Sequence, residues 1–179
     1  GRPNAGKSSL TNKLTNNDRS IVSDVAGTAR DAIDTLVEHD GQMYRIVDTA
    51  GLRRKSQIDE DVEYYGFVRA LRAIDRADVA VLVIDGTLGV TNEDQRVANY
   101  AAERGCALVI VLNKWDIVEG AEAKEKVRFD LEDELVFVSY APVIAISALT
   151  GKGVERVWKA IDQAYEGFSS ALPTGRLNR

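Results

Sequence analysis

The sequence is poor in cysteine, histidine and proline, and it has no long apolar run. Its single thiol, Cys106, excludes an intrachain disulfide and lies beside a predicted strand, which indicates a core position. The apolar runs, such as residues 79–84, are far too short to span a bilayer, and nothing resembles a signal peptide. His39, the only histidine, flanks a predicted turn, so we expect no catalytic role for it. We therefore expect a cytoplasmic protein without a membrane partner.

Excess charge is also absent, since the net charge is only −5 over 179 residues. Such a balance excludes a general polyanion binder, so contact with nucleic acid would need a local patch or an attached module. The length and the hydrophobic share of 45% suit one globular domain. We predict that this domain spans residues 1–168. Residues 169–179 lose the helical period and are interpreted as a linker.

The first eight residues fit G-x-x-x-x-G-K-[ST], the pattern of a phosphate-binding loop. Glycines let several N–H groups point at one anion, and a helix predicted over residues 8–14 would direct its positive end there. Lys7 would neutralise the outer phosphates, and Ser8 would offer its hydroxyl to Mg²⁺. Alone, the pattern also fits a glycine-rich turn before a helix. The residues predicted to bind phosphate are Gly1, Arg2, Pro3, Asn4, Ala5, Gly6, Lys7, Ser8 and Ser9.

Strand and helix patterns then alternate along the chain. Strands are predicted over residues 33–38, 42–47, 79–84, 107–112 and 142–146, and helices over 59–74, 92–104, 119–134 and 154–165. Asp40-Gly41 predicts a hairpin turn, and Thr91 with Asp94 predicts a capping box. Residues 14–32 show no period and are interpreted as a functional or mobile loop. Because a phosphate loop normally leaves the end of a buried strand, we also expect a strand before Gly1.

This alternation predicts an α/β fold of the P-loop type, with a mainly parallel sheet and one antiparallel edge strand contributed by the hairpin. Ligands of such sheets bind at the carboxyl ends of the strands. The phosphate loop, Asp48, Asn113 and Ser147 all fall at predicted carboxyl ends. We therefore expect these four positions to share one site.

Two motifs complete the expected site. Asp48 begins D-T-A-G and would hold Mg²⁺ through water, while the N–H of Gly51 would bond the γ-phosphate. Asn113-Lys114-Trp115-Asp116 fits N-K-x-D, in which one carboxylate accepts both N1–H and N2–H of guanine and would stay unpaired against adenine. We expect the side chain of Asn113 to connect the phosphate loop to the loops that bind the base, and Trp115 to pack against the protein rather than contact the base. A second base-binding loop is predicted at Ser147, Ala148 and Leu149, in which the N–H of Ala148 would meet guanine O6.

These motifs, in this order, resemble the Era-like group of translation-factor-related GTPases. Within that group the chain is similar to the second GTPase domain of the Der (EngA) family of tandem-GTPase ribosome-assembly factors. The stretches that carry the resemblance are residues 22–28, 31–35, 48–55, 69–78, 139–142 and 174–179.

The resemblance implies a six-stranded fold that hydrolyses GTP to GDP, with Mg²⁺ and K⁺ as cofactors. It implies a large-ribosomal-subunit or rRNA partner of the full-length protein, and neighbouring GTPase and KH-like domains; it implies no DNA partner. Lys7, Asn4 and Gly51 would act in catalysis, with Asn4 holding K⁺. The nucleotide-binding residues that it adds are Thr49, Ala50, Gly51 and Leu52.

The sequence departs from the family in the first loop, where Gly-Thr-Thr-Arg-Asp is replaced by G-T-A-R-D at residues 27–31. Ala29 has no hydroxyl for Mg²⁺, so we expect either Thr28 or a water molecule to take its place as metal ligand. Leu52 stands where Ras-like enzymes carry a water-orienting glutamine, so slow turnover is expected. Two alternatives stay open at this point: a nucleotide-gated module without hydrolysis, and a P-loop ATPase of another branch.

Overall fold

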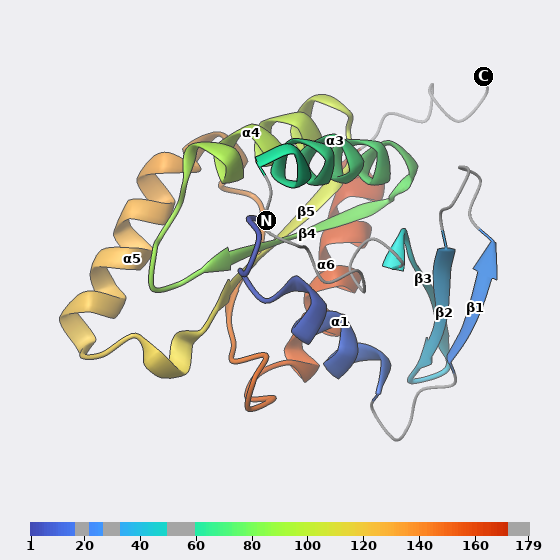
Figure 1. Ribbon diagram of the computed structural model, residues 1–179, viewed down its shortest axis with the longest axis horizontal. Helices are drawn as coiled ribbons and strands as arrows, with labels where there is room; N and C mark the ends of the chain where they lie inside the picture. The colour runs from blue at the N-terminus through green and yellow to red at the C-terminus, as the bar shows by residue number, and fades with distance from the viewer. Residues whose placement is uncertain (17–21, 27–32, 50–59, 172–179) are drawn as a thin grey trace.

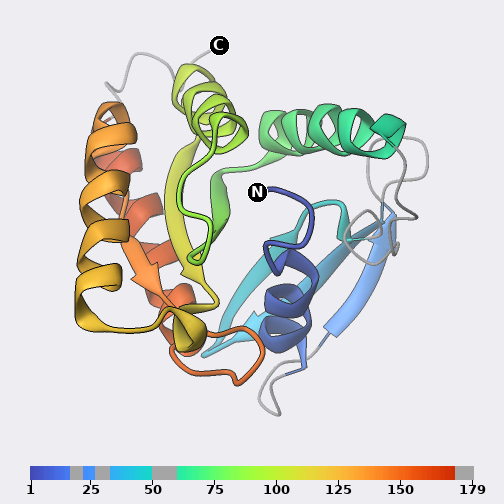
Figure 2. The ribbon, with the colours of Figure 1, turned by 60° about the vertical axis from the view of Figure 1, so that its left-hand side comes forward.

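The computed structural model describes residues 1–16, 22–26, 33–49 and 60–171. Figures 1 and 2 both place strands β1–β3 at one end of the molecule and helix α5 at the other. The helices are α1 (Lys7–Thr15), α3 (Glu60–Arg76), α4 (Asn92–Glu103), α5 (Ala121–Glu134) and α6 (Glu155–Ala171), with short 3₁₀ turns η1 (Trp115–Ile117) and η2 (Val136–Val138). The strands are β1 (Val22–Ala26), β2 (Ile33–His39), β3 (Gln42–Ile46), β4 (Val79–Asp85), β5 (Ala107–Asn113) and β6 (Val143–Ala145).

The described strands form two sheets rather than the single sheet that was predicted. Strands β1, β2 and β3 are antiparallel, whereas β4, β5 and β6 are parallel. The α/β class is confirmed, and the described strands comprise one parallel and one antiparallel sheet. Strands β3 and β4 do not pair with each other, and a cleft of about 1700 Å³, lined by residues of both, separates them. The predicted strand before Gly1 lies outside the sequence and stays an expectation.

Strand β1 lies within the segment in which no regular structure was predicted. Its residues pair antiparallel with β2, from Val22 opposite Val37 to Ala26 opposite Ile33. The hydroxyl of Thr35 also donates to Asp24 Oδ1 at 2.9 Å. The five residues of β1 are too few for an alternation of polar and apolar side chains to predict a strand. The strand is stabilised by its pairing with β2 and not by local preference.

The parallel sheet is buried on both faces, which explains its continuous apolar runs. On one face, Leu82, Leu108 and Ile110 pack against α4 and α5; on the other, Val83 and Val109 join a second cluster. The second cluster includes Leu10 and Leu14 of α1 and Val157 and Trp158 of α6. All seven residues of β5 are buried. Alternating side chains of one strand thus supply both cores.

Other elements follow the sequence closely. Thr91 and Asp94 form the predicted capping box, with Thr91 as N-cap of α4, and Cys106 is buried. Strand β6, within the predicted range 142–146, is an edge strand with Val143 exposed, because no strand covers its outer side within the described sheet. Residues 169–171 continue helix α6 beyond the predicted domain boundary. Within the described ranges, every helix is too short or too polar to cross a membrane.

Candidate functional site

The phosphate-loop sequence forms a tight turn that leads directly into α1. Asn4 and Gly6 have positive φ angles of 62° and 101°, and the N–H of Ala5 donates to Arg2 O at 3.2 Å. A Cβ at Gly6 would lie 2.0 Å from Nδ2 of Asn113, so only glycine fits this position. The loop therefore curls around the start of α1, where the helix dipole favours an anion.

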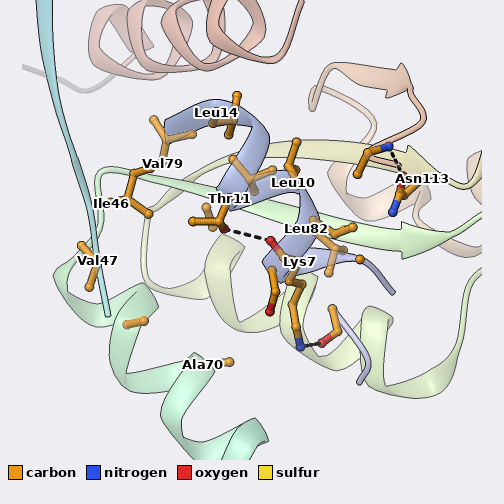
Figure 3. Close-up of a pocket in the computed structure, with 18 of the residues that line it drawn as sticks. Lys7, Leu10, Thr11, Leu14, Ile46, Val47, Ala70, Val79, Leu82 and Asn113 are labelled. Atoms are coloured by element: carbon orange, nitrogen blue, oxygen red, sulfur yellow. Dashed lines mark hydrogen bonds between the residues drawn. The ribbon is translucent and has the colours of Figure 1, made fainter. Parts of the chain in front are cut away.

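Lys7 is the first residue of α1 and lies at the mouth of this turn. Its Nζ donates to Gly1 O at 2.5 Å, and its own carbonyl accepts from the hydroxyl of Thr11 at 2.8 Å (Figure 3). Burial lowers the pKa of the Lys7 ammonium, and the carboxylates of Glu93 and Asp94 oppose that shift. A partly buried ammonium paired with a carbonyl dipole would gain from a bound anion.

Asn113 connects the phosphate loop to the loop at Ala148, as the sequence predicted. Its Nδ2 donates to Ala5 O at 2.8 Å, and its Oδ1 accepts from the N–H of Ala148 at 2.9 Å. The side chain is buried, since Asn113 is only 3% exposed. One amide therefore uses both ends to fix two loops that are far apart in sequence.

The same contact involves the N–H that was predicted to meet guanine O6. The N–H of Ala148 donates to Asn113 in this structure, and its contact with a base stays a prediction. The physical reason is burial: Ala148 is 2% exposed, so its N–H needs a partner inside the protein. The neighbouring Leu149 is 81% exposed, and Ser147 is buried and accepts from Thr150 N at 3.2 Å.

Lys114 is held by a carboxylate that sequence reasoning did not select. Its Nζ lies 2.7 Å from Oδ2 of Asp85, the last residue of β4, and its backbone is left-handed with φ 60°. Burial alone would raise the pKa of Asp85, but hydrogen bonds from Lys114 and from Thr87 lower it overall. Asp85 stands at a strand's carboxyl end next to a glycine, so the rule that selected Asp48 would have found it.

Trp115 packs against the core of the parallel sheet, as predicted, with Lys124 and Arg128 over its ring. Asp116 follows in the 3₁₀ turn η1 and is exposed. It lines the same cleft as Lys7, which places a carboxylate and the phosphate loop around one space. The predicted site residues that line this cleft are Gly1, Pro3, Asn4, Gly6, Lys7, Ser8, Ser9, Asp48, Asn113, Lys114, Asp116, Ser147, Ala148 and Leu149.

Asp48 reaches the cleft from two residues beyond β3. Both of its carboxylate oxygens accept hydrogen bonds from Arg69 of α3, at 2.5 and 2.7 Å. Its neighbour Thr49 is fully buried and bonds the hydroxyl of Thr35 at 2.7 Å and the carbonyl of Ile33 at 3.0 Å. The sequence had given Arg69 no role in the site. The predicted residues Thr28, Ala50, Gly51 and Leu52 lie outside the described residues.

His39, for which no catalytic role was expected, packs against an aromatic side chain of the core. Its ring stacks on Trp158 of α6, with centroids 5.0 Å apart and planes at 16°. Tyr44 of β3 meets the same indole at 4.5 Å and donates its hydroxyl to Asp162 at 2.7 Å. These contacts attach the antiparallel hairpin to α6.

Comparison of the sequence with known proteins finds GTPases. Residues 1–114 match the model of a family described as 50S ribosome-binding GTPase. The chain is 50% identical over 180 residues to GTPase Der of Fusobacterium nucleatum, covering 99% of this chain and 41% of that protein. It is 47% identical over 180 residues to GTPase Der of Desulforudis audaxviator, again covering 41% of the relative. The chain thus spans about two fifths of the length of these curated relatives.

Solved structures give the same fold at lower identity. One is Era in complex with MgGDPNP and nucleotides 1506–1542 of 16S ribosomal RNA, with a TM-score of 0.67 and 24% identity over 92% of this chain and 54% of that one. Another is elongation factor SelB from Methanococcus maripaludis with the GTP analogue GppNHp, with a TM-score of 0.67 and 19% identity over 93% of this chain and 32% of that one. At these identities the likeness shows the fold.

Proposed function

Because the chain belongs to the 50S ribosome-binding GTPase family, we propose that it binds GTP and GDP with Mg²⁺ and hydrolyses GTP. The observation that carries this proposal is the double contact of Asn113, which joins the phosphate loop to the loop beside the base motif. A ligand with a polyphosphate at one end and a purine at the other fits a site fixed in this way. Asp116 would recognise guanine N1–H and N2–H, with the stem of Lys114 against the base.

The residues present fit a magnesium nucleotide. The cradle at Gly6 leaves no room for a side chain, and Lys7 lies at its mouth. Among the described residues, no group of three or more His, Cys, Asp or Glu side chains could hold a metal by itself. Mg²⁺ bound chiefly by phosphates and water, with Ser8 and Asp48 as protein contacts, suits such a sparse donor set. The ion would neutralise charge that develops on the phosphates during hydrolysis.

The roles of this chain's own groups follow from their positions. The backbone of the loop and the start of α1 would orient the phosphates, while Lys7 would stabilise negative charge on the outer ones. Asn4, exposed and left-handed at the loop, would hold K⁺ against the phosphates and so raise a slow intrinsic rate. Thr28 and Gly51 would complete the γ-phosphate side of the site.

We further propose that the chain is the GTPase domain of a longer, cytoplasmic ribosome-assembly protein. The support is the identity to proteins named GTPase Der, of which this chain spans about two fifths. The large ribosomal subunit or its rRNA would be met by the whole protein. A neighbouring GTPase domain and a KH-like domain would supply contacts that a chain with a net charge of −5 does not provide by itself.

Nucleotide competition tests the proposal. A fluorescent GDP analogue bound to the chain should be displaced by GTP and GDP but not by ATP. Asp116→Asn should weaken GDP binding at least tenfold and improve xanthosine diphosphate binding, because xanthine offers an acceptor where guanine offers N2–H. Asp133→Asn, an exposed change on α5, is the matched control. Stronger displacement by ATP than by GTP would refute the guanine assignment.

Turnover is measured separately. Single-turnover hydrolysis of GTP in K⁺ should exceed that in Na⁺, and Asn4→Ala should remove the difference. A rate equal to that of buffer in both salts would refute hydrolysis and leave a nucleotide-gated binding module.

A further inference from the structure

Helix α3 is attached to the antiparallel sheet by two arginine–aspartate pairs. Arg69 donates to both carboxylate oxygens of Asp48, and Arg76 donates to Asp34 Oδ2 at 2.6 Å. The two arginines are seven residues apart, so they share one face of the helix two turns apart. The pairs are joined to each other, because the N–H of Asp48 donates to Asp34 Oδ1 at 2.9 Å.

The two pairs differ in their surroundings. The side chain of Asp34 is fully buried, and Arg45 of β3 lies 3.7 Å from it as a second cation. Loss of these partners would leave a buried charge unpaired, which would strongly lower the stability of the folded chain. The side chains of Asp48 and Arg69 retain exposures of 12% and 33%, and both residues line the cleft. Solvent and ions can therefore reach the carboxylate of Asp48, whereas the carboxylate of Asp34 is enclosed and only its partners Arg45 and Arg76 are partly exposed.

Asp48 is also the carboxylate that would face Mg²⁺ under the proposed function, on which this inference rests. A two-pronged guanidinium occupies both of its oxygens, and its backbone is turned into the left-handed region with φ 58°. The guanidinium binds both oxygens of the carboxylate, so a magnesium ion held through water at the same oxygens would lie close to a second positive charge that repels it. The two cations therefore compete for one anion.

We propose that Arg69 is an internal cation that competes with Mg²⁺ for Asp48 and thereby couples metal binding to the position of α3. Binding of Mg²⁺ with nucleotide releases Arg69 and frees the N-terminal half of the helix. The Arg76–Asp34 pair stays closed and retains the C-terminal end. Arg69 thus sets the magnesium concentration at which the site is filled, without contacting the base.

The test compares nucleotide binding with and without the metal. Fluorescent GDP is titrated onto the unaltered chain and onto Arg69→Gln, first in excess EDTA and then over a series of Mg²⁺ concentrations. We expect equal affinity in EDTA and a magnesium midpoint about tenfold lower for the variant, as removal of one charge-assisted pair worth about 1.4 kcal/mol would give. Arg72→Gln, an exposed arginine of the same helix, is the matched control and should leave the midpoint unchanged.

A second readout needs no nucleotide. In the ligand-free chain, Arg69→Gln should accelerate amide hydrogen exchange in the first half of α3 and leave residues 71–76 unchanged, and Arg72→Gln should do neither. Arg69→Lys, which keeps the charge but loses the two-pronged geometry, should give an intermediate magnesium midpoint.

The outcomes are distinguishable. A midpoint for Arg69→Gln equal to or above that of the unaltered chain, with normal GDP binding, overturns the competition and leaves the proposed function intact. Absence of GDP binding by the unaltered chain at every Mg²⁺ concentration overturns the proposed function, and the competition with it. A variant that loses GDP affinity equally in EDTA and in Mg²⁺ shows a general structural role and also overturns it.

Discussion

Replacement of Asn113 by alanine tests the central contact of the site. The side chain is 3% exposed and makes two hydrogen bonds, to the carbonyl of Ala5 and from the N–H of Ala148. Both partner residues are themselves buried, at 1% and 2% exposure. Alanine therefore removes two bonds and leaves a donor and an acceptor that water reaches poorly. Removal of one partner is the costly case, because the other group keeps its desolvation penalty.

The expected magnitude follows from these two groups. A buried unsatisfied group costs about 1–3 kcal/mol, so the two groups left by Asn113→Ala should lower the free energy of unfolding by about 2–6 kcal/mol. Asn113→Asp separates the two ends: it keeps an acceptor for Ala148 but places a carboxylate oxygen beside the carbonyl of Ala5. We expect Asn113→Asp to be destabilised through the phosphate-loop side, and both variants to lose at least tenfold in GDP affinity.

Urea unfolding without nucleotide, followed by circular dichroism, measures the stability term. Asn99→Ala is the control, since its amide bonds Glu103 on the surface of α4 and should change the free energy by less than about 0.5 kcal/mol. If Asn113→Ala unfolds at the same urea concentration as Asn99→Ala, with equal slopes, the two loops are not held by this amide and the reasoning fails.

A further prediction concerns another group of the site. Asp85→Asn keeps an oxygen for Thr87 but loses the ion pair with Lys114, so calorimetry should show GDP affinity reduced about threefold to tenfold at nearly unchanged stability; unchanged affinity would refute a positioning role.

Local patterns predicted much of the fold because the corresponding physics is local. Strand β5 is a continuous apolar run since both faces of a parallel strand are buried, and all seven of its residues are buried in the structure. The capping box of α4 needs only Thr91 and Asp94, three residues apart, and it formed as expected. The contact from Asn113 to the phosphate loop was also predictable, because carboxyl ends of parallel strands meet at one edge of the sheet.

The features that sequence reasoning missed depend on partners distant in the chain. Strand β1 exists through its pairing with β2, which its own five residues do not reveal. Within the described residues β3 and β4 do not pair, and the strand expected before Gly1 lies outside the sequence. Arg69 belongs to none of the nucleotide-binding motifs. Its pairing with Asp48 depends on how α3 packs in the folded chain.

The contacts of the site divide it into two parts with different tasks. At the base end, Asn113 and Lys114 already have internal partners, in Ala5, Ala148 and Asp85, and these bonds fix their positions before any ligand arrives. A site fixed in advance loses little entropy on binding, so recognition of the base needs no rearrangement there. At the phosphate end, the internal partner of Asp48 is Arg69, a cation that the metal would have to replace. Under the proposed function, nucleotide recognition and metal engagement would be separable steps, and only the second would move a helix.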